Sequence, residues 1–273
     1  MSQSSFTREN GPRPFQIPGC PAPGGPRFAY LNLRGHPRGE TMLAALLDAG
    51  FRPEIVIDEE SALAERGRDS QIGKLGKVPW WRPAPSAAQT CADRGIRYLT
   101  VRNHNANETR AALVESEVAL AVLGDTRILK PGVIDAVPHG IVNVHPGLLP
   151  DVRGNNPYVW SIIHDLPQGV SAHLIDSGVD RGPILFARRK TLPAAVTLPE
   201  LIFLVNEWCA GAVTDVLRSL ADGSATVTTQ DDHDGLTFRE ARPEIWALAA
   251  KILDERAEVP RLLHAATAET RSL

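Results

Sequence analysis

The residues Val118–Leu123, VALAVL, form an unbroken apolar run that Gly124 follows. A strand has such a run when helices cover both faces of its parallel sheet. Other strand-like segments alternate along the chain with segments of helical spacing. The predicted strands lie at 27–33, 54–57, 96–101 and 140–145, and the predicted helices lie at 40–49, 107–115 and 131–137. This alternation predicts βαβ units. We therefore expect an α/β fold with an open, mostly parallel, Rossmann-like sheet, helices on both faces and a short C-terminal appendage.

The chain is predicted to have three parts. Residues 1–26 form an N-terminal arm, whose segment 11–26 holds six prolines and four glycines and is either disordered or strapped across the domain. The main domain spans 27–223, with further strands at 170–175 and 184–189 and a helix at 199–220. The C-terminal extension 224–273 is predicted to contain a strand or hairpin and a helix near 245–263. The poorly patterned stretch 61–90 is predicted to be a loop around Trp80 and Trp81.

Composition excludes several classes of partner. The chain has 29 Lys+Arg and 32 Asp+Glu, a net charge of −3, so no strong field attracts nucleic acid or an anionic membrane. Three scattered cysteines suit a reducing cytosol. No apolar run approaches the roughly 18 residues of a membrane span. We expect a soluble cytoplasmic protein without a nucleic-acid or membrane partner, and no metal, because the histidines show no ligand spacing.

Three polar residues are candidates for catalysis. Asn143 and His145 end a predicted strand two residues apart, so both side chains point to the same face at the edge where open α/β sheets bind ligands. An amide beside an imidazole can bind an oxyanion, and the imidazole can carry a proton. Asp180 lies in a Gly-rich turn, and its carboxylate near His145 would raise the pKa of the imidazole and orient its ring. Taken singly, each residue also fits a structural role.

Several motifs occur in order along the chain. They are Leu123–Pro131 (LGDTRILKP), Asn143–Pro150 (NVHPGLLP), Arg153–Pro157 (RGNNP), Gly169–His173 (GVSAH) and Asp180–Leu185 (DRGPIL). Together they resemble the folate-dependent formyltransferases, and the sugar and small-molecule N-formyltransferases in particular. The resemblance covers about residues 27–223.

The resemblance implies transfer of a formyl group from 10-formyltetrahydrofolate to the amine of a small metabolite, such as an amino sugar, an amino acid or a specialised-metabolism intermediate. It implies catalytic roles for Asn143, His145 and Asp180. The implied folate-binding residues are Arg127, Ile128, Leu129 and Asp176, and the candidate acceptor-binding residues are Arg153, Asn155, Asn156 and His104. His104 is included because it follows a predicted strand. His173 matches a recurring family histidine, for which a structural and a catalytic role are both open.

Other functions remain open at this stage. The same pocket would serve transfer of another folate-borne unit, such as a hydroxymethyl group, or a non-catalytic folate-binding relic. An oxidoreductase is disfavoured because Leu33–Glu40 matches a dinucleotide fingerprint poorly. The turn 34–40 lacks the Gly-Ser-Asn turn with which glycinamide ribonucleotide formyltransferases bind phosphate, so this substrate is disfavoured. The C-terminal tail is too short and too acidic to form the basic barrel of a tRNA formyltransferase. The segment 234–240 resembles a closing hairpin, and the helix at 199–220 leaves a homo-oligomer open.

Overall fold

The fold is built on a central sheet of seven strands. The computed structural model describes residues 11–22, 24–231 and 234–269. Within them the strand order is β4-β3-β2-β5-β6-β8-β9. The parallel strands are β2 (Phe28–Leu33), β3 (Ile55–Glu59), β4 (Arg97–Val101), β5 (Leu120–Asp125) and β6 (Ile141–His145). The last two strands, β8 (Gln168–Leu174) and β9 (Ile184–Lys190), are antiparallel. The predicted α/β class and mostly parallel sheet are confirmed.

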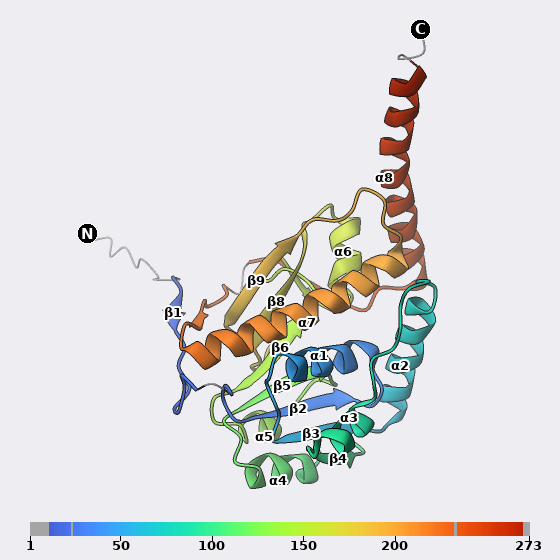
Figure 1. Cartoon of the computed structure of the whole chain (residues 1–273). Helices are drawn as coiled ribbons and strands as arrows, with labels where there is room; N and C mark the ends of the chain where they lie inside the picture. The colour runs from blue at the N-terminus through green and yellow to red at the C-terminus, as the bar shows by residue number, and fades with distance from the viewer. Residues whose placement is uncertain (1–10, 23, 232–233, 270–273) are drawn as a thin grey trace, which may run out of the picture.

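Helices cover both faces of this sheet (Figure 1). One face packs on α1 (Pro37–Asp48) and α7 (Leu198–Asp222), and the other on α4 (Asn107–Glu115) and α5 (Pro131–Ile134). Alternate residues of one strand enter the two cores: Phe28 and Tyr30 pack toward α1, whereas Ala29 and Leu31 pack toward α4. This division follows from the two-residue period of a strand, and it explains why the central strands are apolar throughout.

The strand order reverses between β2 and β5, because β3 and β4 extend the sheet on one side and β6 on the other. In open α/β sheets, ligands bind outside the carboxyl ends of the strands at such a reversal. The order therefore places any ligand site near the ends of β2, β5 and β6.

The prediction of a loop over 61–90 is wrong for most of its length. Residues Ala62–Leu75 form α2, which Ser61 caps by accepting a hydrogen bond from the Ala64 N–H, and α3 (Ala87–Arg94) begins within the same stretch. Only Ala64 and Leu75 are buried in α2. The helix therefore has almost no apolar face, and the spacing that identifies an amphipathic helix is absent from its sequence.

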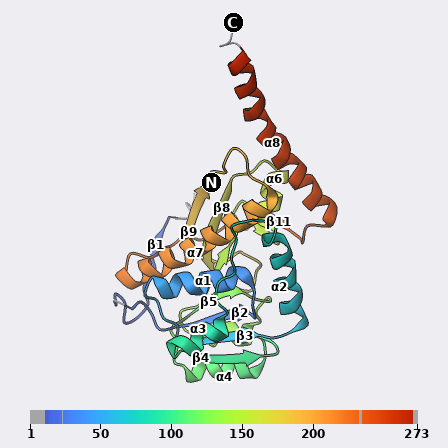
Figure 2. The ribbon, with the colours of Figure 1, turned by 45° about the vertical axis from the view of Figure 1, so that its right-hand side comes forward.

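Of the strand or hairpin expected in the C-terminal extension, the described residues show strands that do not pair with each other. Its strand β11 (Leu236–Phe238) pairs in parallel with β7 (Val152–Gly154), a short strand in the main domain, so the partner is remote in sequence. After β7 comes α6 (Pro157–Ile163), which packs against α8 (Pro243–Glu269). The far end of α8 projects away from the body in both views (Figure 1, Figure 2). The predicted helix at 245–263 lies within α8.

The described part of the N-terminal arm straps across the main domain. Strand β1 (Arg13–Pro14) pairs antiparallel with β10 (Thr226–Val227), and the Phe15 N–H donates to the Ala225 carbonyl at 2.8 Å. The side chain of Ile17 is only 1% exposed and joins the main core. Of the two alternatives for 11–26, the strap is therefore correct, while residues 1–10 and 23 lie outside the described residues. The division into three parts stays a prediction.

We expect the strap to stabilise the fold. Replacing Ile17 with Ala removes buried methyl groups and leaves a cavity, so the free energy of unfolding should fall by about 2–4 kcal/mol. Equilibrium urea denaturation measures this change. The exposed neighbour Gln16 is the matched control, and Gln16→Ala should change stability by less than about 0.5 kcal/mol. Equal stability of both variants would mean that the arm contributes nothing to the core.

Candidate active site

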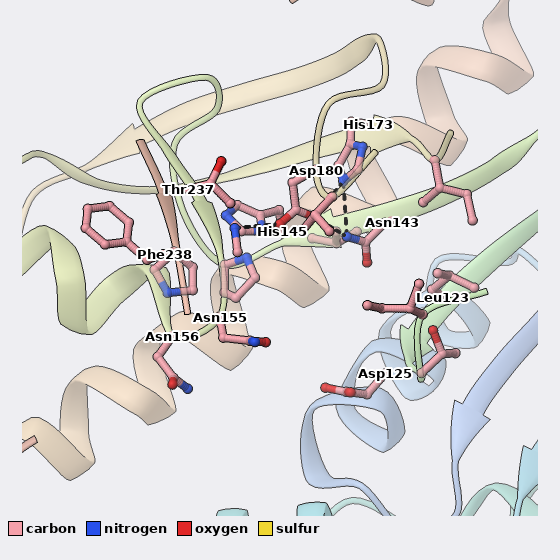
Figure 3. A pocket seen from close by; sticks show the side chains of 18 of the residues that line it. Leu123, Asp125, Asn143, His145, Asn155, Asn156, His173, Asp180, Thr237 and Phe238 are labelled. Carbon is pink, nitrogen blue, oxygen red and sulfur yellow. Dashed lines mark hydrogen bonds and ion pairs between the residues drawn. The ribbon is translucent and has the colours of Figure 1, made fainter. Parts of the chain in front are cut away.

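A cavity of about 540 Å³ opens at the carboxyl ends of β5 and β6. Its walls come from the end of β5, the following segment 126–129, the end of β6, the loop after β7, the loop between β8 and β9, and the segment 237–240. In Figure 3, Leu123 and Asp125 lie on one side of this cavity and Asn155 and Asn156 on another. The cavity therefore forms where the sheet order predicts a ligand site.

Asn143, His145 and Asp180 meet at one wall of the cavity, as the sequence predicts (Figure 3). The Nδ1 atom of His145 is 3.4 Å from Oδ2 of Asp180, and Nδ2 of Asn143 is 3.5 Å from Oδ1 of the same carboxylate. Asp180 has a φ of 53°, a left-handed conformation that few residues other than glycine adopt. Backbone strain of this kind is concentrated at functional sites.

His173 completes this cluster. In the antiparallel register of β6 and β8 it lies directly opposite Asn143, and its Nε2 is 3.4 Å from Oδ1 of Asp180. Its Nδ1 is 3.0 Å from the Leu174 carbonyl, which can only accept, so Nδ1 carries the proton in the neutral ring. The free Nε2 then accepts a hydrogen bond from Nδ2 of Asn143 at 3.1 Å. His173 is therefore a member of the polar cluster and orients the Asn143 amide.

The protonation of His145 follows from its surroundings. Its Nε2 lies 2.8 Å from the Val152 carbonyl and so donates to it. Burial lowers the pKa of His145, and although the Asp180 carboxylate acts in the opposite direction, the net shift is downward. The predicted effect of the carboxylate on the His145 pKa is thus present, but the almost complete burial of the ring outweighs it. The neutral ring has its proton on Nε2 and the lone pair of Nδ1 facing Asp180.

Asp180 remains ionised. Burial alone would raise its pKa, but the neighbouring imidazoles of His145 and His173 and a 2.8 Å hydrogen bond from the Gly154 N–H outweigh burial. The net result is a pKa well below the usual range for an aspartate. A carboxylate therefore faces the Nδ1 atom of a neutral imidazole.

The residues assigned to folate by resemblance form another wall of the cavity. Ile128 is 80% exposed, whereas Leu129 is buried, and both line the cavity. The Arg127 guanidinium donates to both carboxylate oxygens of the buried Glu59, with its Nε at 2.7 Å from Oε2. Asp176 also lines the cavity, where its Oδ1 accepts from the Gly178 N–H at 2.8 Å.

Two of the four candidate acceptor residues reach the cavity and two do not. Asn155 and Asn156 line it, and Asn156 Oδ1 also accepts from the Ala241 N–H. Arg153 is buried and donates to Gln230 and to the backbone carbonyls of residues 231 and 234, so it holds the C-terminal extension instead. His104 is fully buried, with its Nε2 at 3.1 Å from the Ile57 carbonyl. Both departures arise because the side chain binds protein groups remote in sequence.

The structure adds residues that the sequence analysis did not assign. Arg38 forms a 2.6 Å ion pair with Asp125 at the cavity, and His36 approaches the same carboxylate at 3.4 Å. The segment Thr237–Glu240 forms a further wall. No local signal identifies these residues, because each is placed near the cavity by a contact with a partner far away in the chain.

Across residues 11–22, 24–231 and 234–258, no group of three or more His, Cys, Asp or Glu side chains is placed to hold a metal ion. In the described part of the chain, no helix combines the length and the apolar character needed to cross a membrane.

The sequence and the fold are similar to those of known formyltransferases. Residues 82–201 match the family model for formyl transferase. A methionyl-tRNA formyltransferase from Acidobacterium capsulatum is 27% identical over 218 residues, which cover 77% of this chain and 66% of the relative. Matches to two other methionyl-tRNA formyltransferases cover 39% and 37% of their lengths, so the chain spans less than two thirds of these curated relatives. Residues 82–201 of this chain thus match the formyl transferase family.

Two solved structures share the fold. One is glycinamide ribonucleotide transformylase 1 from Symbiobacterium toebii, with a TM-score of 0.56 and 19% identity over 77% of this chain and 96% of that one. The other is an N-formyltransferase from Helicobacter canadensis in complex with folinic acid and dTDP-3-aminofucose, with a TM-score of 0.55 and 17% identity over 78% of this chain and 70% of that one.

We expect His145 to titrate below the ordinary histidine value of about 6.5. Burial disfavours the charged ring, so the neutral form with the proton on Nε2 should persist below that pH. The variant Asp180→Asn removes the charge that favours protonation, and the pKa should fall further. Nitrogen-15 NMR of the histidine side chains measures both values. A pKa above 6.5 in the unaltered protein would show that the carboxylate outweighs burial.

Proposed function

We propose that this chain transfers a formyl group from 10-formyltetrahydrofolate to the amine of a small metabolite. The observation that carries the proposal is the convergence of Asn143, His145 and Asp180 on a cavity that the segment 126–129 also lines. Acyl transfer to an amine needs a donor for the developing oxyanion and an acceptor for the proton that the amine loses. The cluster offers both, and the match of residues 82–201 to the formyl transferase family model supports this type of reaction.

His145 and Asp180 form the proton acceptor in this mechanism. The Nδ1 lone pair of neutral His145 faces Oδ2 of Asp180 at 3.4 Å. Two facing acceptors repel each other, and a proton placed between them turns the repulsion into an attraction. We infer that this pair takes the proton from the attacking amine, directly or through a water molecule. The low pKa of Asp180 keeps the carboxylate ionised before the proton arrives.

Asn143 is the proposed donor to the formyl oxygen. Its amide nitrogen has two hydrogens, of which one bonds His173 Nε2 at 3.1 Å. The contact with Asp180 is long, at 3.5 Å, which leaves the second hydrogen for the formyl oxygen. His173 keeps the amide in this orientation. A preorganised donor of this kind stabilises the charge that develops on oxygen as the amine adds to the formyl carbon.

The segment 126–129 fits the heterocyclic end of the formyl donor. Leu129 is only 7% exposed, yet neither its N–H nor its C=O has a hydrogen-bond partner among the described residues. Buried main-chain groups need partners, and the edge of a pterin ring presents donors and acceptors side by side. We propose that Arg127, Ile128, Leu129 and Asp176 hold this ring. The Helicobacter canadensis enzyme was solved with folinic acid, which supports a folate ligand on this fold.

The proposed acceptor is a small amine that contacts Asn155 and Asn156. The net charge of −3 favours a small molecule over a nucleic acid. The relatives named methionyl-tRNA formyltransferase do not fit the expectation of no nucleic-acid partner, so that expectation remains to be tested. Transfer of a hydroxymethyl unit and a non-catalytic folate-binding relic are the alternatives. A homo-oligomer likewise stays a prediction.

Calorimetric titration with 5-formyltetrahydrofolate, a stable analogue of the donor, is the first test. We expect saturable binding, because the cavity and the main-chain groups of Leu129 fit the ligand. Incubation with the true donor and panels of amines, with aminoacylated tRNA in a separate arm, should then yield a formylated acceptor by mass spectrometry. The mass of the product separates formyl from hydroxymethyl transfer. Failure of the folded protein to bind at millimolar ligand, with and without amines, would refute the proposed donor.

Substitutions in the cluster test the mechanism once an acceptor is known. Asp180→Asn removes half of the proton acceptor and His145→Ala the other half, so each should lower turnover at least ~10²-fold. Matched controls are Asp165→Asn and His139→Ala, whose side chains lie outside the cavity lining. Thermal melting monitors folding in all four variants. Turnover like that of the unaltered protein in either cluster variant would remove the proposed proton acceptor.

A further inference from the structure

The segment between β5 and α5 is held by one side chain from a neighbouring loop. Asn105, between β4 and α4, contacts this segment with both ends of its amide. Its Nδ2 donates to the Ile128 carbonyl at 3.0 Å, and its Oδ1 accepts from the Lys130 N–H at 2.7 Å. A side-chain amide that both donates and accepts in this way makes the two hydrogen bonds that the main chain of a neighbouring strand would make to this segment.

These two bonds determine where Leu129 presents its own main-chain groups. In an extended chain, successive peptide groups point in alternate directions. The carbonyl before Leu129 and the N–H after it both face Asn105. The N–H and C=O of Leu129 itself therefore face away from Asn105. Leu129 lines the cavity and Asn105 is not among its lining residues, so this opposite side is the ligand side.

The loop that carries Asn105 is itself fixed. The Asn105 N–H donates to Oδ1 of Asn103 at 2.8 Å, and the neighbouring His104 N–H donates to Oε2 of Glu59 at 2.8 Å. Glu59 is the fully buried carboxylate that binds the Arg127 guanidinium. One short loop thus holds the segment at both ends, at Arg127 through Glu59 and at Ile128 and Lys130 through Asn105.

We propose that Asn105 is a positioning residue for the formyl donor, an inference that rests on the proposed function. It sets the main-chain donor and acceptor of Leu129 at the spacing that a heterocyclic edge with adjacent hydrogen-bonding atoms requires. Asn105 does not touch the ligand. Its contribution is to order the backbone before binding, which lowers the entropy cost of binding.

The variants Asn105→Ala and Asn105→Asp test this role. The first removes both bonds, and the second keeps an acceptor for Lys130 but sets a carboxylate against the Ile128 carbonyl. Each should weaken binding of 5-formyltetrahydrofolate by about tenfold or more, since two hydrogen bonds that order the segment are lost or opposed. Asn107→Ala, an exposed position two residues away, is the matched control and should bind as the unaltered protein does.

Amide hydrogen exchange provides the readout that a general structural role would not move. In the free protein, the Lys130 amide should be protected and should lose this protection in Asn105→Ala, with the melting temperature unchanged within about 2 °C. On titration with 5-formyltetrahydrofolate, the Leu129 amide should become protected in the unaltered protein. Tight binding by Asn105→Ala would overturn this inference and leave the proposed function standing. No binding by the unaltered protein would overturn both.

Discussion

The buried carboxylate of Asp180 is the group on which the rest of the site depends. A carboxylate with a side chain only 13% exposed is stable where hydrogen bonds and polar neighbours replace the water it has lost. Its partners come from three strands: the Gly154 N–H from β7, Asn143 and His145 from β6, and His173 from β8. Because polar groups must surround the Asp180 carboxylate, the three strands have to meet where they can supply those groups. The geometry of the cluster is therefore a consequence of fold stability.

The two sides of the cavity are held by different kinds of force. Around Asp180, charge and a strained backbone set the positions of the side chains. Around Leu129, neutral hydrogen bonds from Asn105 set the direction of main-chain groups. A rigid arrangement of charge suits a step in which a proton moves, because the surroundings need not reorganise. An ordered backbone edge suits recognition of a flat heterocycle, whose hydrogen-bonding atoms have fixed spacing.

The parts of the fold that could be predicted from the sequence are those with a local signal. The apolar run of β5 and the two-residue spacing of Asn143 and His145 each follow from a period that a few residues reveal. The helix α2 could not be predicted because it buries too little apolar surface to show a period. Arg153 and His104 were misplaced for a related reason: their partners, residues 230, 231 and 234 for Arg153 and Ile57 for His104, are remote in sequence. Burial also lowers the pKa of His145 in spite of the nearby Asp180 carboxylate. No local pattern in the sequence shows how deeply a side chain is buried.

The strap formed by β1 has a consequence for the order of events during synthesis. Its partner β10 follows α7, so β1 cannot pair until nearly all of the described chain has left the ribosome. Closing so long a loop costs little more entropy than closing one of moderate length. The pairing of β1 is therefore delayed by the late position of β10 in the chain and not by a free-energy cost. Until then, residues 13–14 remain open to any protease or chaperone nearby. Protection of this short strand thus marks a chain whose translation has passed β10.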